Sequence, residues 1–339
     1  MTETPQSPRR AEKRQTMKMP KKHQPPVYSA GSDPSVPAWV AWRRAIRFYF
    51  VIPSILPAVL GGIMAWAAGY SFHLPHFLLV VIGVTLNHFG LNLVDDVLDY
   101  RHAVDLTKGG EKNFFTGGSG VLPEGLLKDS HMLRVAGVFF ASTAIIGAYL
   151  TWTCGWPVLA LGLFGMASSI FYTTPPVRFG YRGFGELGLL VNFGPVIVLG
   201  SYYVQAQTLG WQPFIASLVP GFLMWSMIII NEIPDYEADR LGGKWNLVAR
   251  FGRKTGVFLY GAGLTAAYGI LIAAAWAKTL SPFVLLGLAS LPFAVKSFVV
   301  MKRHLNDPLA MTPANLAMIK VHNVTVGAVI VAYLIEALR

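Results

Sequence analysis

Nine apolar runs of roughly 20 residues follow one another along the chain, and they restrict its fold more than any other feature. A helix needs about 20 apolar residues to cross a hydrocarbon core about 30 Å thick. A membrane β-barrel would instead show shorter, alternating segments. The sequence therefore predicts an all-α, polytopic membrane protein with nine transmembrane helices. The runs occupy residues 46–69, 76–97, 132–152, 156–172, 185–205, 212–234, 255–277, 281–300 and 316–337.

Composition agrees with a membrane domain that follows a polar tail. Of the 339 residues, 53% are hydrophobic and 13% are charged, whereas soluble domains carry about 25% charged residues. Residues 1–37 are rich in Pro, Lys and Arg, which is typical of disorder, and they lack the apolar segment of a signal peptide. We expect a disordered basic tail over 1–37 and one nine-helix domain over 38–339. That domain opens with PAWVAWRRAIRFYF, whose Trp and Arg spacing is typical of a helix in the membrane interface.

The basic residues indicate an orientation in the membrane. Ten Lys and Arg precede residue 48, five lie between 101 and 134, and five lie between 240 and 254. The alternate connections hold only Lys278. This pattern predicts that the N-terminus lies in the cytoplasm and the C-terminus on the opposite side of the membrane. We expect that membrane to be a bacterial inner membrane. The net charge of +11 is then explained by topology and anionic lipid, and we expect the bilayer, not nucleic acid, as its partner.

Polar side chains interrupt the end of the second apolar run, in the segment NLVDDVLDYRHAVD. Asn92, Asp95, Asp96 and Asp99 are spaced i, i+3, i+4 and i+7, which places them on one face of a helix. Carboxylates on one face repel one another unless a cation lies among them. Carboxylate and amide oxygens suit Mg²⁺ or Mn²⁺. A solvated helix end is the simpler interpretation of this first acidic stripe taken alone.

A second acidic stripe repeats the pattern at the end of the sixth run, in NEIPDYEAD. Asn231, Asp235 and Asp239 are spaced i, i+4 and i+8, whereas Glu232 and Glu237 are expected to point elsewhere. The predicted topology puts both stripes on the same side of the membrane. Because Mg²⁺ is readily shared between carboxylates and phosphate oxygens, two facing stripes predict a metal site that binds a diphosphate.

Basic residues near both stripes fit such a ligand. The glycine-rich loops that carry some of them do not match the P-loop pattern, so a P-loop NTPase is not indicated. Arg182 is interpreted as a topological anchor. The candidate substrate-binding residues are Lys108, Lys112, Tyr172, Arg178, Arg240 and Lys244.

Cysteine and histidine offer no alternative site. Cys154 is the single cysteine, which excludes an internal disulfide and a thiolate metal cluster. The eight His show no metal-binding spacing. His88 lies one turn before Asn92, and a structural hydrogen bond is its expected role.

From about residue 40 to the C-terminus the sequence resembles the UbiA superfamily of intramembrane aromatic prenyltransferases. The resemblance rests on the two Asn-and-Asp motifs, the second within NEIPDYEADRLGGKWNLVARFG. Within the superfamily, FTGGSGVLPEGLL and YTTPPVRFGYRGFGELGLLVNFGPVIVLGSYYVQ are most similar to 1,4-dihydroxy-2-naphthoate polyprenyltransferases of menaquinone synthesis. The resemblance implies Mg²⁺-dependent transfer of a prenyl group from a polyprenyl diphosphate to an aromatic acceptor. The implied catalytic residues are Asn92, Asp96, Asp99, Asn231, Asp235 and Asp239.

Several alternatives stay open at the level of the sequence. The acceptor is one of naphthoate, 4-hydroxybenzoate, homogentisate or a chlorin; with naphthoate, carbon dioxide leaves in place of a proton and no strong general base is required. A divalent-cation or proton-coupled transporter is a rival from another class, because acidic residues in membrane helices often mark ion paths. Transport sites usually lie near the bilayer midplane, whereas both stripes end their helices beside Lys and Arg. A non-catalytic lipid-binding protein would leave the two motifs unexplained.

Overall fold

The computed structural model describes residues 36–102, 113, 115 and 117–339. Residues 1–35 of the predicted tail lie outside the described residues, as do Lys108 and Lys112. Every regular element in the described part of the chain is helical, which confirms the predicted all-α class.

Seven helical segments of the described chain are long and apolar enough to cross a membrane, so the protein is an integral membrane protein. An eighth crossing is added if the N-terminal helices α1 (Ala38–Ala45), η1 (Phe48–Phe50) and α2 (Ile52–Ala67) are joined across a 49° bend. Helix α5 (Trp156–Phe171) is apolar but shorter, with 16 residues, and the count of nine spans stays a prediction. The seven are α3 (Leu74–Arg101), α4 (Asp129–Cys154), α6 to α7 (Gly185–Ala206), α8 (Trp211–Leu241), α10 (Arg253–Trp276), η4 with α11 (Pro282–Arg303) and α12 (Thr312–Ala337).

Short elements complete the chain. The segment Gly185–Ala206 divides into α6 (Gly185–Val191), the π-helical turn η3 (Asn192–Val196) and α7 (Ile197–Ala206). The segment Pro282–Arg303 divides into η4 (Pro282–Ser290) and α11 (Leu291–Arg303). The connections hold η2 (Phe179–Tyr181) and α9 (Leu247–Phe251).

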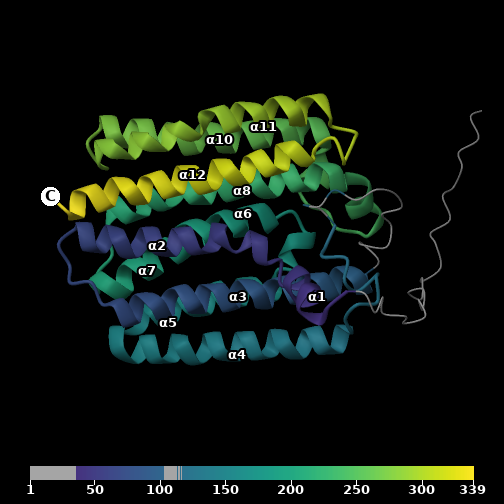
Figure 1. Cartoon of the computed structure of the whole chain (residues 1–339), viewed down its shortest axis with the longest axis horizontal. Coiled ribbons are helices and arrows are strands. Elements are labelled where there is room, and N and C mark those ends of the chain that lie inside the picture. Colours follow the sequence, from purple (N-terminus) through teal and green to yellow (C-terminus); the bar gives the residue numbers. More distant parts are fainter. Residues whose placement is uncertain (1–35, 103–112, 114, 116) are drawn as a thin grey trace, which may run out of the picture.

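The long helices run side by side along the long axis of the molecule (Figure 1). Helices α10 and α11 form one edge, α4 forms the other, and α12, α8, α2 and α3 lie between them. One end of the bundle carries α1 and the connections from α3 to α4, from α8 to α10 and from α11 to α12. We call this the loop end. The C-terminal turns of α3 and α8, which carry the two acidic stripes, both lie there.

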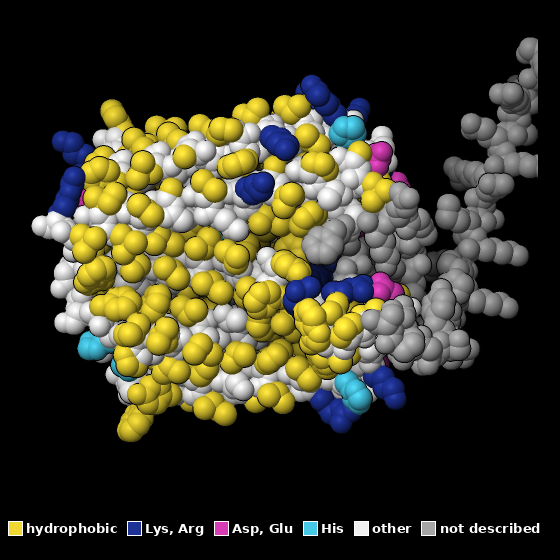
Figure 2. All heavy atoms as spheres, in the orientation of Figure 1, with side chains coloured by type: hydrophobic (Ala, Val, Ile, Leu, Met, Phe, Trp, Pro, Cys, Tyr) yellow, Lys and Arg dark blue, Asp and Glu magenta, His cyan; other side chains and the backbone are white. Residues whose placement is uncertain are grey.

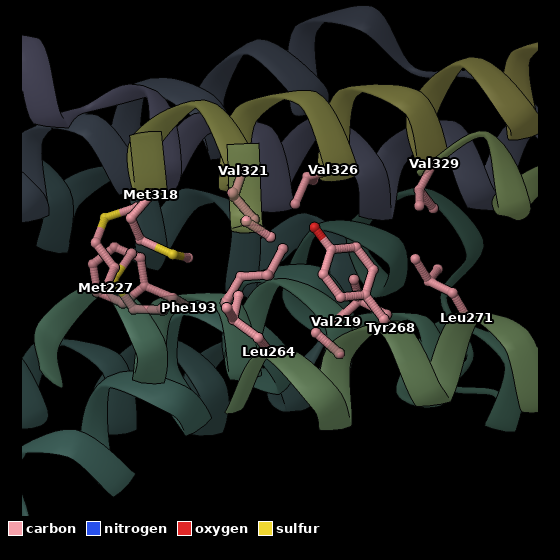
Figure 3. Packing of buried hydrophobic residues seen from close by; sticks show 14 of the residues in the cluster. Phe193, Val219, Met227, Leu264, Tyr268, Leu271, Met318, Val321, Val326 and Val329 are labelled. Carbon is pink, nitrogen blue, oxygen red and sulfur yellow. The ribbon is translucent and has the colours of Figure 1, made fainter. Parts of the chain in front are cut away.

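A hydrophobic core holds α8, α10 and α12 together. One buried cluster contains Val219 and Met227 of α8, Leu264 and Tyr268 of α10, and Met318 and Val321 of α12 (Figure 3). The outer surface is hydrophobic as well: apolar side chains cover most of the face in Figure 2, and acidic groups are visible only near its two ends. A bundle that is apolar inside and outside is suited to lipid surroundings.

Candidate functional site

A cavity of about 550 Å³ lies at the loop end, and residues of both acidic stripes line it. The structure therefore brings together two motifs that are about 140 residues apart in the sequence. Other parts of its wall come from α1, α2, Lys244 and residues 113, 115 and 117–120. The stripe residues in the wall are Asn92, Asp95 and Asp99 from α3 and Asn231, Asp235 and Asp239 from α8.

The aspartates of the first stripe and Asp239 of the second are buried, and Asp235 is half-buried. The interpretation of the first stripe as a solvated helix end is therefore wrong. Asp95, Asp99 and Asp239 expose only 9%, 6% and 4% of their surface. Burying a charge is costly unless a partner compensates it. These residues therefore need cations, either from the protein or from a ligand.

Asp96 differs from the other stripe residues because it does not line the cavity. Its Oδ1 lies 2.5 Å from Nη2 of Arg47, and the backbone N–H of Ser119 donates to both of its oxygens at 3.1 and 3.2 Å. The same Arg47 nitrogen lies 3.4 Å from Oδ2 of Asp95. Asp96 thus anchors the N-terminal segment and the loop after α3 in this structure, and its predicted ligand role stays a prediction.

Lys244 is the predicted basic residue that reaches the acidic wall. Its Nζ lies 2.9 Å from Oδ2 of Asp99, and 15% of its side chain is exposed. Burial alone would lower the pKa of Lys244, but the carboxylates of Asp99, Asp95 and Asp239 raise it well above its ordinary value. Gly243, with φ of +74°, makes the turn that brings Lys244 back toward α8, a conformation that glycine adopts without strain.

The other predicted substrate-binding residues that the structure describes divide into two groups. Tyr172 lines the cavity and is buried. Arg178 lies elsewhere, with its guanidinium 4.2 Å from the ring centre of Tyr181. Arg240 is exposed and lies over the rings of Tyr236 and Trp245. Neither arginine lines the cavity in this structure.

Three arginines of the N-terminal segment line the cavity, although the sequence interpretation gave them only an interfacial role. They are Arg43, Arg44 and Arg47. Arg44 forms a bidentate ion pair with Glu124, in which its Nη1 and Nη2 lie 2.8 and 2.7 Å from the two carboxylate oxygens. The charge pattern of the sequence could have identified them, because three arginines within five residues can compensate the negative charge of the aspartates of α3.

The loop Gly117–Gly120 bridges the two stripes. The backbone N–H of Gly117 donates to Oδ2 of Asp235 at 3.2 Å, while that of Ser119 donates to Asp96. Gly117, Gly118 and Gly120 have φ values of +76°, +72° and +78°. A chain without glycines at these positions would be strained in this path, which explains the TGGSG sequence.

Glu232 corrects a sequence expectation, since it was expected to point away from the second stripe. Its residue surface is only 6% exposed, and it lines the cavity. Its carboxyl group lies near that of Glu186, a fully buried residue of α6. Because α6 packs on α8, the face next to the stripe is covered too. Glu237 does point outward, with 68% of its side chain exposed.

The donor groups of the cavity fit a hard divalent cation. Among the described residues, no group of three His, Cys, Asp or Glu side chains is close enough to hold one ion directly. Asp95, Asp99, Asp235 and Asp239 nevertheless line one cavity. Oδ1 of Asp95 is buried without a hydrogen-bond partner, as expected for an oxygen whose partner is a bound cation.

Buried acidic and basic groups share one cavity at the end of an apolar helical bundle, an arrangement that can bind a charged ligand within the membrane. The profile of the UbiA prenyltransferase family matches residues 54–319. The chain therefore belongs to the UbiA prenyltransferase family, and it is a prenyltransferase. This assignment sets aside the transporter and the non-catalytic alternatives.

Curated relatives match most of the chain. The 1,4-dihydroxy-2-naphthoate octaprenyltransferase of Bacillus subtilis is 26% identical over 275 residues, covering 80% of this chain and 86% of that protein. The enzyme with the same name from Mycobacterium tuberculosis is 29% identical over 261 residues, covering 77% and 85%. A 2-carboxy-1,4-naphthoquinone phytyltransferase from Synechocystis is 26% identical, covering 83% and 89%.

Solved structures share the fold. A UbiA homologue from Archaeoglobus fulgidus, bound to GPP and Mg²⁺, aligns with a TM-score of 0.63 and 13% identity. The alignment covers 88% of this chain and 100% of that one. A UbiA homologue from Aeropyrum pernix aligns with a TM-score of 0.59 and 17% identity, covering 84% and 97%. At these identities the likeness supports the fold alone.

Proposed function

We propose that the protein transfers a polyprenyl group from an allylic diphosphate to 1,4-dihydroxy-2-naphthoate, with Mg²⁺ as its cofactor, in menaquinone synthesis. The observation that carries this proposal is a single cavity lined by buried carboxylates, by Lys244 and by three arginines. The names of the relatives from B. subtilis and M. tuberculosis support the choice of acceptor.

The polar part of the cavity is suited to the donor diphosphate. Asp95, Asp99, Asp235 and Asp239 would hold Mg²⁺, which neutralises charge on the diphosphate and makes it a better leaving group. Lys244, Arg43, Arg44 and Arg47 would bind phosphate oxygens directly. Such fixed positive charge, placed where negative charge develops on the leaving group, lowers the barrier to breaking the allylic C–O bond.

The apolar part of the cavity protects the carbon that reacts. Phe50, Leu91, Phe193, Met224 and Met227 line the same space as the charged groups. They exclude water, which would otherwise capture the allylic cation. The electron pair of the broken C–O bond leaves with diphosphate, a ring carbon of the acceptor forms the new C–C bond, and carbon dioxide leaves the naphthoate.

A second cavity of about 170 Å³ offers room for apolar units of the donor. It lies among α3, α4, α5 and α7, and His88, Leu91 and Phe193 line both cavities. His88 makes the expected structural hydrogen bond, with its Nδ1 2.7 Å from Oγ of Ser54. The donor would extend from the charged cavity past these residues into the membrane-embedded part of the bundle.

The proposed location is a bacterial inner membrane, with the loop end in the cytoplasm and the C-terminus outside. The positive-inside pattern supports this orientation. The loop end carries both stripes and the connections that hold most of the basic residues between the helices. A water-soluble diphosphate product would then be released into the cytoplasm.

The test is an assay with purified protein in detergent, geranylgeranyl diphosphate and four separate acceptors: naphthoate, 4-hydroxybenzoate, homogentisate and a chlorin. We expect a prenylated product of decarboxylated naphthoate by mass spectrometry, and no product with EDTA. Asp235→Ala should abolish turnover, whereas Lys254→Met, which changes an exposed residue of α10, should not. Product from another acceptor alone would overturn the proposed substrate, and full activity in EDTA would overturn the role of Mg²⁺.

A further inference from the structure

Three asparagine side chains form a continuous chain of hydrogen bonds that joins α12 to the second acidic stripe. Nδ2 of Asn113 lies 3.1 Å from Oδ1 of Asn315, and Nδ2 of Asn315 lies 2.8 Å from Oδ1 of Asn231. Asn113 and Asn315 are each 1% exposed. Asn231 lines the cavity, so this series of hydrogen-bonded amides ends at the cavity.

Backbone groups determine the direction of these hydrogen bonds. Nδ2 of Asn113 also donates to the carbonyl of Pro308 at 2.8 Å, and its Oδ1 accepts from the N–H of Phe115 at 3.0 Å. A backbone carbonyl only accepts and a backbone N–H only donates, so the orientation of the Asn113 amide is fixed. Asn315 must then accept with its oxygen and donate with its nitrogen. Asn231 consequently accepts with its oxygen.

The asparagines of the two stripes are therefore held in opposite orientations. Asn92 donates its Nδ2 to the carbonyl of Ile46 at 3.0 Å, which leaves its oxygen for a ligand in the cavity. Asn231 turns its oxygen to Asn315, which leaves its Nδ2 for such a ligand. An amide oxygen can bind Mg²⁺, whereas an amide nitrogen carries only donors and binds an acceptor such as a phosphate oxygen.

We propose that Asn315 is a positioning residue, which holds the amide of Asn231 with its N–H groups toward a phosphate oxygen of the donor. Asn92 supplies an oxygen to the cation, so the two stripes are not equivalent. This assignment replaces the predicted metal-ligand role of Asn231, and it rests on the proposed binding of a diphosphate with Mg²⁺. It also connects donor binding to α12 and to the loop after α3, neither of which belongs to a stripe.

The same substitution at the two stripe positions tests the assignment. Asn92→Asp keeps an oxygen for the cation but loses the N–H that donates to the Ile46 carbonyl. Its donor kcat/KM should therefore fall less than that of Asn231→Asp, and the Mg²⁺ concentration for half-maximal activity should not rise. Asn231→Asp removes the N–H donors and places a carboxylate against phosphate. Loss of one charge-assisted hydrogen bond should lower donor kcat/KM by about 10- to 100-fold, with the acceptor KM unchanged. Equal losses in both variants would overturn the proposal.

A substitution on α12 tests the positioning role. Asn315→Asp still accepts from Asn113 but cannot donate to Asn231, so the Asn231 amide should turn over and present its oxygen to the cavity. We expect a donor KM at least about fivefold higher, with the acceptor KM and the Mg²⁺ requirement unchanged. Asn315→His, which retains a ring N–H, should recover part of the loss. A donor KM at the wild-type value in Asn315→Asp would overturn the positioning role.

Inorganic diphosphate separates this proposal from the proposed reaction. Together with Mg²⁺, inorganic diphosphate should stabilise the purified protein, and the stabilisation is measured as a shift in melting temperature. This measurement needs no acceptor and no turnover. The shift should persist in Asn92→Asp and shrink in Asn231→Asp. If wild-type protein makes no product with any acceptor, the proposed reaction fails but this comparison still decides the assignment. An equal shift in wild type and Asn231→Asp would overturn the amide contact.

Discussion

Replacing Lys244 with Met tests the electrostatic account of the site. The substitution keeps much of the side-chain length and removes the charge that lies 2.9 Å from Oδ2 of Asp99. Asp99 would retain the hydroxyl of Tyr181, which donates to its other oxygen. The side chains of Lys244 and Asp99 are only 15% and 8% exposed, so water would replace little of the lost interaction. Breaking a buried ion pair by removing one partner costs about 3–5 kcal/mol.

Two measurements follow from that magnitude. Without Mg²⁺, Lys244→Met should have a lower melting temperature in detergent than wild type, and Mg²⁺ should restore more stability to the variant than to wild type, because the ion replaces the missing positive charge. With Mg²⁺, the lost contact to diphosphate should reduce donor kcat/KM by about 10- to 100-fold, equivalent to about 1.5–3 kcal/mol. Lys254→Met, at an exposed position, is the matched control.

The pH dependence of the stability difference has a definite sign. Burial lowers the pKa of Lys244, but Asp99, Asp95 and Asp239 raise it well above its ordinary value of 10.5. A raised pKa means that the contribution of the charged lysine is fully present below pH 10.5 and is lost only as the pH rises through the folded-state value. The difference between wild type and Lys244→Met should therefore be constant between about pH 7.5 and pH 9. Unchanged stability without Mg²⁺, together with unchanged donor kcat/KM, would refute the role of Lys244.

Three other predictions address the assembly of the site. Mg²⁺ with a non-hydrolysable donor analogue should raise the melting temperature of wild type by a shift equivalent to about 2.7 kcal/mol at 100 times the dissociation constant. Asp99→Asn and Asp239→Asn should each reduce this shift, and the reduction in the double variant should differ from the sum of the two. Additive losses would indicate two independent sites. Arg47→Met should destabilise the Mg²⁺-free protein by about 3–5 kcal/mol, because Asp96 is only 3% exposed; a melting temperature within 1 °C of wild type would contradict the ion pair. Gly61→Ala should destabilise the bundle by about 1–3 kcal/mol in thermal unfolding, since an added Cβ would overlap a backbone carbonyl of α7; a neutral effect would contradict the close packing of α2 on α7.

Local pattern was sufficient for the helical class and for placing both acidic stripes at helix ends. Apolar runs of membrane length predict helices whatever their neighbours are, because backbone hydrogen bonds must be satisfied inside the bilayer. The spacing of Asn231, Asp235 and Asp239 predicts a shared face because an α-helix has a fixed period. Both stripes, as a result, were placed at helix ends on the same side of the membrane without any tertiary information.

Which polar groups meet was decided only by tertiary structure. Adjacent Asp95 and Asp96 are equally acidic in the sequence, yet Asp95 lines the cavity while Asp96 is covered by Arg47 and by the loop after α3. Glu232 lines the cavity on the part of α8 against which α6 packs.

The sequence by itself therefore determined a helical membrane protein with two acidic helix ends, because apolar length and helical period are properties of each segment alone. The return of α1 toward α3, the path of the glycine loop and the orientation of the Asn231 amide depend on contacts between residues distant along the chain. Those contacts are set by how the helices pack, and no local spacing encodes them. Asn315, which lies 84 residues from Asn231, is the clearest case, because only the packing of α12 against α8 brings the two amides together.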